Sequence, residues 1–442
     1  MASTRAMMDS NASPFYGKVM LAPMVRVCSA GFRALCTRHG ADLVFTEEVV
    51  AAKLATCQRE VVSYPTVDTP MAEYVSYDAF QNAYKRTVVL ATPVRSPPSS
   101  VETVARTSAE RTPRVILQLG VADPARGAAA IAACSDDVDG VDINMGCPKK
   151  FSVRNGFGAA LMKKPAVGGA IVRAVYDAAN NEAAVAARGG RRLLVSIKTR
   201  LKETAEETVA MLRAVLTAAQ HTPAHFVVHA VTLHARTPDQ RSEQPPLYER
   251  AAAVVRSCKA DPCFAGVCFV LNGSVLSRED GVAKCAHYGF DASMIARAAL
   301  EDARCFHHST SSAACARVTR SPQAAEDYAM AIMKELYLYS VRYRTVFNNF
   351  KYHLTRAFPI VPALKPLMAV VQSDLRSYAD CYDFFDVTAE EKMLVEKCAQ
   401  HLELLAERPP ASRKREASAE AATTAVDAEP ANKAPRLEGE SC

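Results

Sequence analysis

Eight short apolar runs, each ended by a polar residue or a tight turn, constrain this 442-residue chain more than any other feature of its sequence. Alanine-rich stretches of helical composition separate the runs, which are bounded by glycine, proline or charged residues. The runs are Lys18–Leu21, Asp42–Thr46, Val115–Leu119, Gly140–Asn144, Leu193–Lys198, Val231–His234, Cys268–Leu271 and Ala292–Ile295. Their number and rhythm predict repeated strand and helix units that close into a barrel.

The groups that follow the runs favour a closed barrel over an open sheet. They are Pro23 with Met24, Glu47, Gln118, Asn144 with Cys147, Lys198 with Arg200, His234 with Arg236, Asn272 with Gly273, and Arg297. In a barrel the C-terminal ends of all strands surround one mouth, whereas an open doubly wound sheet gathers its polar ends near one switch point. We therefore predict an α/β fold with a TIM (β/α)8 barrel over residues 14–310.

Composition divides the rest of the chain into three segments. Residues 92–114, rich in Pro, Ser, Thr and Arg, are predicted to form a solvated insertion between the second and third barrel strands. Residues 321–408 are predicted to be an all-α helical domain, because apolar side chains recur every three or four residues over Ala325–Ala357, as one long helix or a pair. Residues 409–442 lack apolar periodicity and are predicted to be a disordered tail.

Charge and cysteine content exclude several classes of protein. The 53 Lys and Arg against 47 Asp and Glu leave a net charge of +6, which falls short of a dedicated nucleic-acid-coating protein. The 14 cysteines form no CxxC pair, so we expect reduced thiols and no structural metal. Neither a signal peptide nor an apolar run of membrane-spanning length is recognisable, so we expect a cytoplasmic protein, as a monomer, with no membrane partner.

A basic stretch inside the predicted helical domain leaves two alternatives open. Between Lys334 and Arg376 seven basic residues stand against two acidic ones, interleaved with Tyr337, Tyr339, Tyr343, Phe347, Phe350 and Tyr352. Such a combination neutralises phosphates and stacks unpaired bases in RNA-binding proteins. The alternative is an amphipathic helix whose aromatic residues lie in the core and whose basic face is solvated.

The segment GVDINMGCPKK, residues 140–150, places Cys147 in a loop directly after the fourth predicted strand. A free cysteine is usually a small buried apolar residue. Here the glycine before it and the proline after it indicate a rigid exposed turn above the barrel mouth. We therefore favour a reactive or proton-donating thiol.

The remaining strand ends describe a ligand that carries both a ring and a phosphate. Lys198 could interact with a bound anion or an electron-rich ring; the alternative is a lysine on the surface. His234 followed by Arg236 is suited to an anionic ligand; the alternative is a structural histidine. The segments Asn272–Ser274 and Ala296–Arg297 follow the last two strands, where barrels commonly hold a phosphate. FMN fits this description, with its ring near Met24 and Gln118, better than a dinucleotide, since no GxGxxG motif opens a helix here.

Several segments resemble the tRNA-dihydrouridine synthases, in particular the eukaryotic type that acts on uridine 20 of cytoplasmic tRNA. They are LAPMVRV, GADLVFTEE, QLG, GVDINMGCPKKFSVRNGFGAALM, IKTRL, TLHARTPDQRS, LNGS and MIARAAL, which occur in the same order over most of residues 17–300. The tract NNFKYHLTR, residues 348–356, resembles the start of the family's helical tRNA-binding domain.

The resemblance implies an FMN-dependent oxidoreductase, reduced by NADPH or alternatively NADH, that reduces the C5–C6 double bond of a uridine in tRNA, with Cys147 supplying a proton to C5. Carried over residue by residue, it implies flavin contacts at Pro23, Met24, Val25, Gln118, Lys198, His234, Asn272, Gly273, Ser274, Ala296 and Arg297. It implies substrate contacts at Asn144, Lys149 and Arg200. The family's NGG or NGD loop reads NGS here, which puts a hydroxyl beside the expected phosphate.

Two other functions remain as alternatives at this point. One is an FMN-dependent barrel oxidoreductase that acts on a free pyrimidine or another small molecule. The other is a tRNA-binding protein whose barrel has lost catalysis, which the presence of Cys147 and Lys198 disfavours. In the tail, the clusters SRKRE and KAPRLE are of the kind that aids nuclear entry, although a charged solvated tail is the simpler interpretation.

Overall fold

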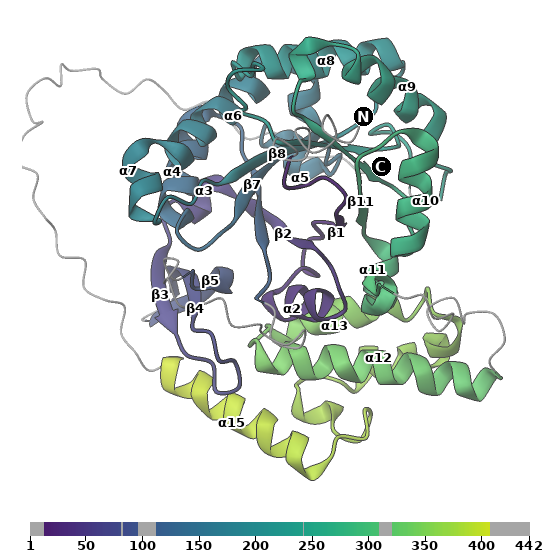
Figure 1. Cartoon of the computed structure of the whole chain (residues 1–442). Helices are drawn as coiled ribbons and strands as arrows, with labels where there is room; N and C mark the ends of the chain where they lie inside the picture. Colours follow the sequence, from purple (N-terminus) through teal and green to yellow (C-terminus); the bar gives the residue numbers. More distant parts are fainter. Residues whose placement is uncertain (1–12, 81–82, 96–111, 242, 309–320, 407–442) are drawn as a thin grey trace, which may run out of the picture. The chain divides into compact units, whose positions relative to one another are not determined.

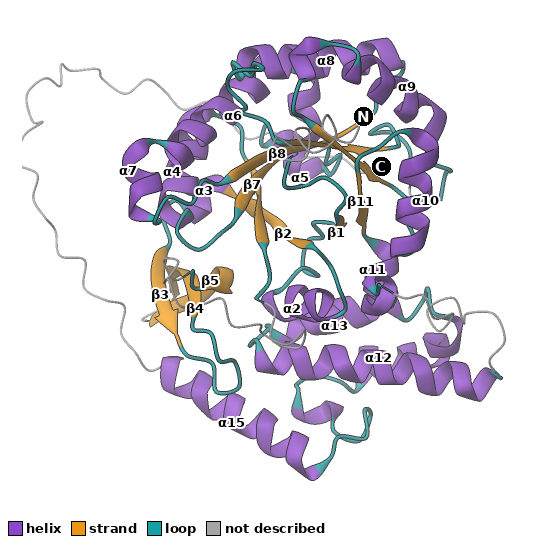
Figure 2. Cartoon of the chain, viewed as in Figure 1, coloured by secondary structure: helices purple, strands orange, loops and turns teal. Residues whose placement is uncertain are grey.

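Eight parallel strands close into a barrel, and helices cover the outside of the barrel (Figures 1 and 2). The computed structural model describes residues 13–80, 83–95, 112–241, 243–308 and 321–406. The barrel strands are β1 (Val19–Leu21), β2 (Leu43–Val50), β6 (Val115–Gly120), β7 (Gly140–Met145), β8 (Leu194–Arg200), β9 (Ala230–His234), β10 (Cys268–Asn272) and β11 (Ala292–Ile295). Pairing of β1 with both β2 and β11 closes the barrel, so the predicted fold and all eight predicted strands are confirmed.

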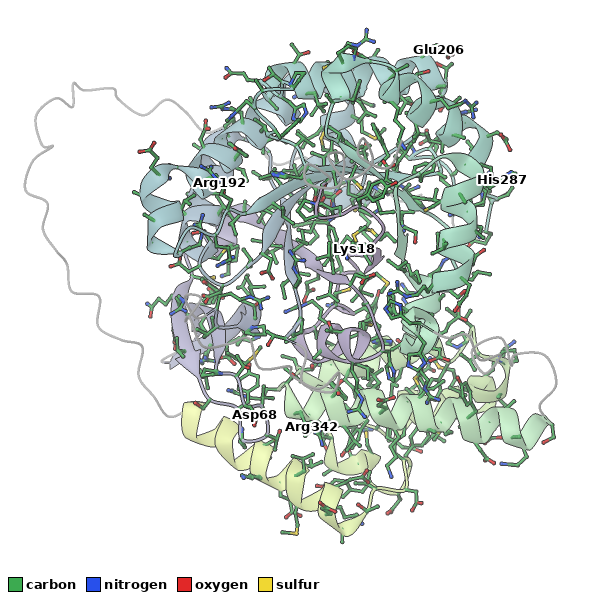
Figure 3. All side chains as sticks on the ribbon, viewed as in Figure 1. Lys18, Asp68, Arg192, Glu206, His287 and Arg342 are labelled. Atoms are coloured by element: carbon green, nitrogen blue, oxygen red, sulfur yellow. The ribbon has the colours of Figure 1, made fainter. Side chains whose placement is uncertain are left out.

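The helices that connect these strands form the outer layer. They are α2 (Ala30–Arg38), α3 (Ala51–Leu54), α4 (Pro124–Cys134), α5 (Lys150–Arg154), α6 (Pro165–Asn180), α7 (Glu182–Ala187), α8 (Ala205–Ala218), α9 (Tyr248–Lys259), α10 (Arg278–Tyr288) and α11 (Arg297–Glu301). The side chains of Ser29, Asp123, Thr204 and Ser277 accept the N–H groups of the first turns of α2, α4, α8 and α10. Figure 3 shows Glu206 of α8 and His287 of α10 on the outer side of this layer.

Side chains that alternate along each strand fill the barrel in layers. An apolar layer at the N-terminal end includes Phe15, Met20, Leu194 and Val270, all of which are buried. Along β8, Leu194 is followed at two-residue intervals by Ser196 and Lys198. The side chains inside the barrel therefore become polar towards the C-terminal ends of the strands. The strand period therefore predicts that the polar residues of neighbouring strands meet at one mouth.

A three-stranded antiparallel sheet between β2 and β6 was not predicted. It consists of β3 (Gln58–Val62), β4 (Met71–Phe80) and β5 (Ala83–Pro93). It attaches to the barrel through Asp137, whose carboxylate accepts hydrogen bonds from Arg59 at 2.6 Å and from the Tyr74 hydroxyl at 2.5 Å. Residues 71–80 contain strand-favouring Tyr74, Val75 and Tyr77, but Glu73 and Asp78 interrupt the apolar run that marks a barrel strand.

The prediction of a solvated insertion over residues 92–114 is wrong for its first residues. Thr92 belongs to β5, is buried, and donates a hydrogen bond to the Asp137 carbonyl at 3.2 Å. Arg95 follows it and pairs with Asp139 at 2.5 Å. Residues 96–111, and the predicted disordered tail 409–442, lie outside the residues that the structure describes.

The C-terminal part of the described chain is helical, as predicted, and the expected long helix is a pair. The helices are α12 (Pro322–Arg342), α13 (Phe347–Ala357), α14 (Met368–Ser373) and α15 (Ala389–Ala406). In Figure 1, α12 and α13 lie beside α2 and α11 of the barrel, and these pairs are in contact. None of the described helices is long and apolar enough to cross a membrane.

A buried histidine joins α13 to the barrel and makes stability depend on pH. His353 lies 3.0 Å from the Leu300 carbonyl and packs edge-on against Phe32, with the ring centroids 4.7 Å apart. Burial lowers the pKa of His353 to about 4, whereas the pKa of a histidine in an unfolded chain is about 6.5. The unfolded chain therefore binds the proton first as pH falls, so the stabilisation is complete above about pH 6.5 and is lost towards pH 4.

We predict that His353→Gln flattens the pH dependence of the free energy of unfolding. Between pH 7 and pH 5, the wild-type histidine contributes a loss of about 2 kcal/mol. Glutamine still donates to the Leu300 carbonyl but does not titrate, so the variant loses correspondingly less. Urea unfolding of both proteins at the two pH values measures the difference, and equal slopes in the two proteins would contradict the assignment.

Candidate functional site

The C-terminal ends of the barrel strands bring together every residue that the sequence analysis assigned to a site. A cavity of about 740 Å³ is lined by Pro23, Met24, Val25, Gln118, Asn144, Cys147, Lys149, Lys198, Arg200, His234 and Arg297. A second cavity of about 460 Å³ is lined by Asn272, Gly273, Ser274 and Ala296, and it shares Pro23, Lys198, Arg200, His234 and Arg297 with the first. The shared residues show that the two cavities adjoin.

The loop after β7 holds Cys147 on one wall of the larger cavity. The Asn144 side-chain oxygen accepts the N–H groups of Gly146 and Cys147, each at 3.0 Å, which makes the turn rigid. Gly158 has φ +62°, and a side chain there would clash with the Cys147 carbonyl at 2.6 Å. The loop therefore requires glycine at residue 158, and it leaves the Cys147 thiol half-buried on the cavity wall.

A chain of polar groups crosses the floor of the mouth. The Lys198 ammonium donates to the Asn272 side-chain oxygen at 2.9 Å. Below it, the buried Asp142 carboxylate accepts hydrogen bonds from Gln118 and Ser196, each at 2.8 Å. Burial raises the pKa of Asp142, and burial together with the neighbouring Arg200 lowers the pKa of Lys198. Asp142 and Asn272 together hold the Lys198 ammonium in place on the floor of the cavity, where it can contact a bound ligand.

Several cations converge where the two cavities meet. Burial lowers the pKa of His234 well below its ordinary value, and the nearby cations Lys198, Arg200, Arg236 and Arg297 lower it further. Burial and the charge of Arg297 likewise lower the pKa of Arg236. The histidine is therefore neutral at pH 7 in a field of positive charge. An anion such as a phosphate relieves this mutual repulsion, so these residues fit the phosphate of the predicted flavin.

The turn after β10 supports that anion site. Gly273 has φ +116°, and a Cβ there would lie 2.9 Å from the His234 ring, so only glycine fits. Ser274 is also left-handed, with φ +52°, and its hydroxyl accepts a hydrogen bond from Arg236 at 3.0 Å. The serine that distinguishes this chain from the NGG pattern thus holds a guanidinium beside the smaller cavity.

Several residues of the site were not assigned from the sequence, and four of them carry polar groups that bear on its chemistry. Glu48 lines the larger cavity from β2, and Asp142 lies buried beneath Lys198. Tyr352 and Arg356 reach the same cavity from α13. The strand period would have found Asp142, which stands two residues before Asn144. Glu48 reaches the cavity because of an irregularity in β2, and Tyr352 and Arg356 reach it because α13 packs against the barrel.

Some residues of the basic and aromatic stretch 334–376 lie in the core, whereas others lie at the larger cavity. Tyr337 and Phe350 are buried core residues, and Arg344 is buried with its guanidinium 3.4 Å from the Glu73 carboxylate. By contrast, the Tyr352 ring has the guanidinium of Arg26 at 5.5 Å from its centroid and that of Arg356 at 5.2 Å. Tyr337, Phe350 and Arg344 therefore have structural roles, whereas Tyr352 lies at the cavity between two arginines.

The fold and this site together define a barrel whose mouth holds a cavity with a cysteine on its wall and an adjoining cavity lined by cations. The family model described as dihydrouridine synthase (Dus) matches residues 20–369. The chain therefore belongs to the dihydrouridine synthase family. The match spans both the barrel and the first helices of the C-terminal part.

Curated relatives are similar over much of the chain. A tRNA-dihydrouridine(20) synthase (NAD(P)+) of Schizosaccharomyces pombe is 31% identical over 294 residues, which are 66% of this chain and 52% of the relative. The chain thus spans about half the length of that relative. The Saccharomyces cerevisiae protein of the same name is 26% identical over 355 residues, 78% of each chain. A tRNA-dihydrouridine(20/20a) synthase of Xanthomonas axonopodis is 31% identical over 43% of this chain and 53% of its own length.

Proposed function

We propose that this protein is a flavin-dependent tRNA-dihydrouridine synthase that reduces a uridine at position 20 of tRNA. The observation that carries the proposal is the placement of Cys147 and Lys198 on one cavity that continues into a cationic pocket, in a chain of the dihydrouridine synthase family. FMN is the proposed cofactor and NADPH the proposed reductant, with NADH as the alternative. The names of the yeast relatives support uridine 20 and a nicotinamide nucleotide.

The proposed arrangement of the flavin follows from the chemistry of the two cavities. The backbone of Pro23–Val25, Gln118 and Lys198 would hold the ring, because these residues all line the larger cavity. His234, Asn272–Ser274 and Ala296–Arg297 would hold the phosphate, because they line the smaller cavity, where the cations gather. When bound and reduced, a flavin supplies a hydride to C6 of a uracil ring.

The residues of this chain would supply the proton and the orientation. Cys147 would donate its thiol proton to C5, because the loop places it on the wall of the cavity that a uracil must enter. Asn144, Lys149 and Arg200 would contact the substrate; Arg200 is held by its hydrogen bond to the Thr237 carbonyl at 2.9 Å. The target base must leave its stack to reach the cavity.

One set of assays tests the proposal against its alternatives. The purified protein is reconstituted with FMN, its visible spectrum is recorded, and dihydrouridine is measured by mass spectrometry after incubation with NADPH and unmodified tRNA. Failure to bind a flavin contradicts both oxidoreductase hypotheses. Reduction of free uridine as efficiently as tRNA supports instead the enzyme of a free pyrimidine. Flavin binding without reduction of any uridine supports a tRNA-binding protein that has lost catalysis.

A cytoplasmic location and a monomeric state are also part of the proposal. Imaging of a fluorescent fusion tests the first, with nuclear entry as the alternative that the basic clusters of the tail suggest. Light scattering of the purified protein tests the second.

We predict that Arg356→Ala weakens tRNA use without impairing flavin reduction. Arg356 lies at the cavity beside Tyr352, donates to its hydroxyl at 3.2 Å, and offers a cation to the phosphates that flank an extruded base. Losing one phosphate contact should raise KM for tRNA several-fold and reduce the slope of log KM against log salt by about 1. Arg173→Ala on α6, whose side chain pairs with Asp177 away from the cavity, is the control. An unchanged salt slope in Arg356→Ala would remove this arginine from the tRNA interface.

A further inference from the structure

An irregularity in β2 directs the side chain of Glu48 towards the site. The pairing of β2 with β6 shifts by one residue between Phe45 and Glu48, so β2 carries a bulge. Within the bulge, the Thr46 hydroxyl accepts the Gln118 N–H at 3.0 Å, and Glu47 accepts the Arg26 N–H at 3.0 Å. Bulges redirect side chains next to active sites, and this one places Glu48 on the wall of the larger cavity.

The surroundings of Glu48 are unusual for a carboxyl group. Its Oε1 atom is buried without a hydrogen-bond partner among the residues that the structure describes. Its Oε2 atom lies 3.4 Å from the Ser152 hydroxyl. Burial raises the pKa of Glu48, although Asn144, Ser152 and Lys149 act in the opposite direction. A buried oxygen without a partner calls for a role, and a carboxyl with a raised pKa is suited to carry a proton.

Ser152 connects this carboxyl to the thiol. The serine is buried on α5, and its hydroxyl lies 3.4 Å from the Cys147 sulfur as well as 3.4 Å from Glu48. A Cβ on Gly158 would lie 3.1 Å from the Cβ atoms of both Cys147 and Ser152, so the glycine permits their close approach. A hydroxyl has one proton to donate and two lone pairs, so it can accept from one neighbour while it donates to the other.

We propose that Glu48 and Ser152 form a relay that returns a proton to Cys147 after each reduction. The proposal rests on the proposed function, in which the S–H bond of Cys147 breaks, a C5–H bond forms and a thiolate remains. The Glu48 carboxylate then takes a proton from water and passes it to the Ser152 oxygen, while the Ser152 proton passes to the sulfur. One proton from water is consumed per uridine, matching the hydride that the nicotinamide nucleotide supplies.

The location of the relay explains why it is useful. A base that fills the larger cavity covers Cys147 from the cavity side, and Glu48, which lines the same cavity, takes its proton from water once the product has left. Ser152 reaches the sulfur from the protein side, because it is buried under the same loop. Cys147 is a catalytic residue of the proposed reaction, whereas Glu48 acts through Ser152.

The kinetic test compares Glu48→Gln, Ser152→Ala and the double variant with wild type, all loaded with FMN. Single turnover of pre-reduced enzyme should be within about twofold of wild type, because the first proton is already on sulfur. Steady-state kcat should fall by about tenfold in each single variant and no further in the double variant, because both changes break one relay. Acetic acid buffer should restore kcat, and Glu47→Gln, the neighbouring carboxylate outside the cavity, should behave as wild type.

A second measurement does not depend on turnover. Alkylation of Cys147 by iodoacetamide is followed at its peptide by mass spectrometry over a range of pH. Glu48→Gln removes a negative charge near the thiolate and should shift the midpoint of alkylation to lower pH, whereas Ser152→Ala removes a hydrogen-bond donor and should shift it to higher pH, each by about half a unit or more.

The outcomes separate the relay from the proposed function. Equal losses in single-turnover and steady-state rates, unchanged kcat in both variants, or identical alkylation profiles in all proteins would overturn the relay. A wild-type enzyme that forms no dihydrouridine from tRNA rejects the proposed function instead. In that case opposite shifts of the alkylation midpoint would still support the coupling of Glu48 and Ser152 to Cys147.

Discussion

Cys147→Ala is expected to abolish most dihydrouridine formation while leaving FMN binding and reduction by NADPH intact. The thiol lies on the wall of the larger cavity, and Cys147 does not line the smaller cavity that is proposed to hold the phosphate. Removing a general acid commonly slows a reaction by roughly 10²- to 10⁴-fold. Single-turnover formation of dihydrouridine in tRNA, measured by mass spectrometry after pre-reduction, gives the size of the loss.

The control for this variant is a second cysteine of similar exposure outside the site. Cys263 is partly exposed, lies in the short turn Pro262–Phe264 and lines neither cavity. Cys263→Ala should therefore reduce uridine at the wild-type rate. If Cys147→Ala also kept that rate, the proton would have to come from another group, and both the proposed role of Cys147 and the relay would be wrong.

Lys198→Met is expected to produce the second large effect, a loss of flavin affinity. The lysine donates to Asn272 and provides the nearest cation for the buried Asp142 carboxylate, so methionine removes both a charged hydrogen bond and a countercharge. Hydrogen bonds to charged groups contribute about 1.5–3 kcal/mol, which corresponds to a roughly ten- to hundredfold increase in Kd for FMN. Quenching of flavin fluorescence on titration with the apoprotein measures Kd directly.

Two comparisons separate flavin binding from damage to the fold. Lys202→Met changes a lysine four residues along the chain that lines neither cavity, and its Kd for FMN should equal that of wild type. Thermal unfolding without FMN shows how far Lys198→Met destabilises the barrel through Asp142. A folded Lys198→Met protein with unchanged Kd would place the flavin ring away from this lysine.

Much of the candidate site could be predicted because each barrel strand follows the same pattern, an apolar run that ends in a polar residue. The barrel needs apolar residues at alternate positions of each strand, and the polar residues that end those strands must meet at one mouth. Asn144 and Lys198, for example, are paired in register on neighbouring strands, as that rule requires. The roles of these residues remain predictions, to be decided by the variants described above.

The sequence could not reveal the groups that reach the site by other routes. Glu48 faces the cavity only because β2 carries an extra residue relative to β6, and a bulge leaves no distinct pattern in a strand of mostly apolar residues. Tyr352 belongs to the same stretch as the buried core residues Tyr337 and Phe350, and helical spacing alone does not distinguish a core ring from one that lines the cavity. The inserted sheet β3–β5 was not predicted for a related reason, because charged residues such as Glu73 and Asp78 interrupt the apolar character of its strands.

By itself, then, the sequence determined the barrel, the order of its strands and the set of residues at its mouth. These features follow from the two-residue alternation of side chains along strands and from the residues that favour turns, and both are visible in the linear sequence. The tertiary structure alone decided which groups surround Cys147 and which aromatic residue meets the cavity. Those contacts join residues far apart in the chain, such as Glu48 and Ser152 or Arg26 and Tyr352, and depend on packing geometry that no local pattern encodes.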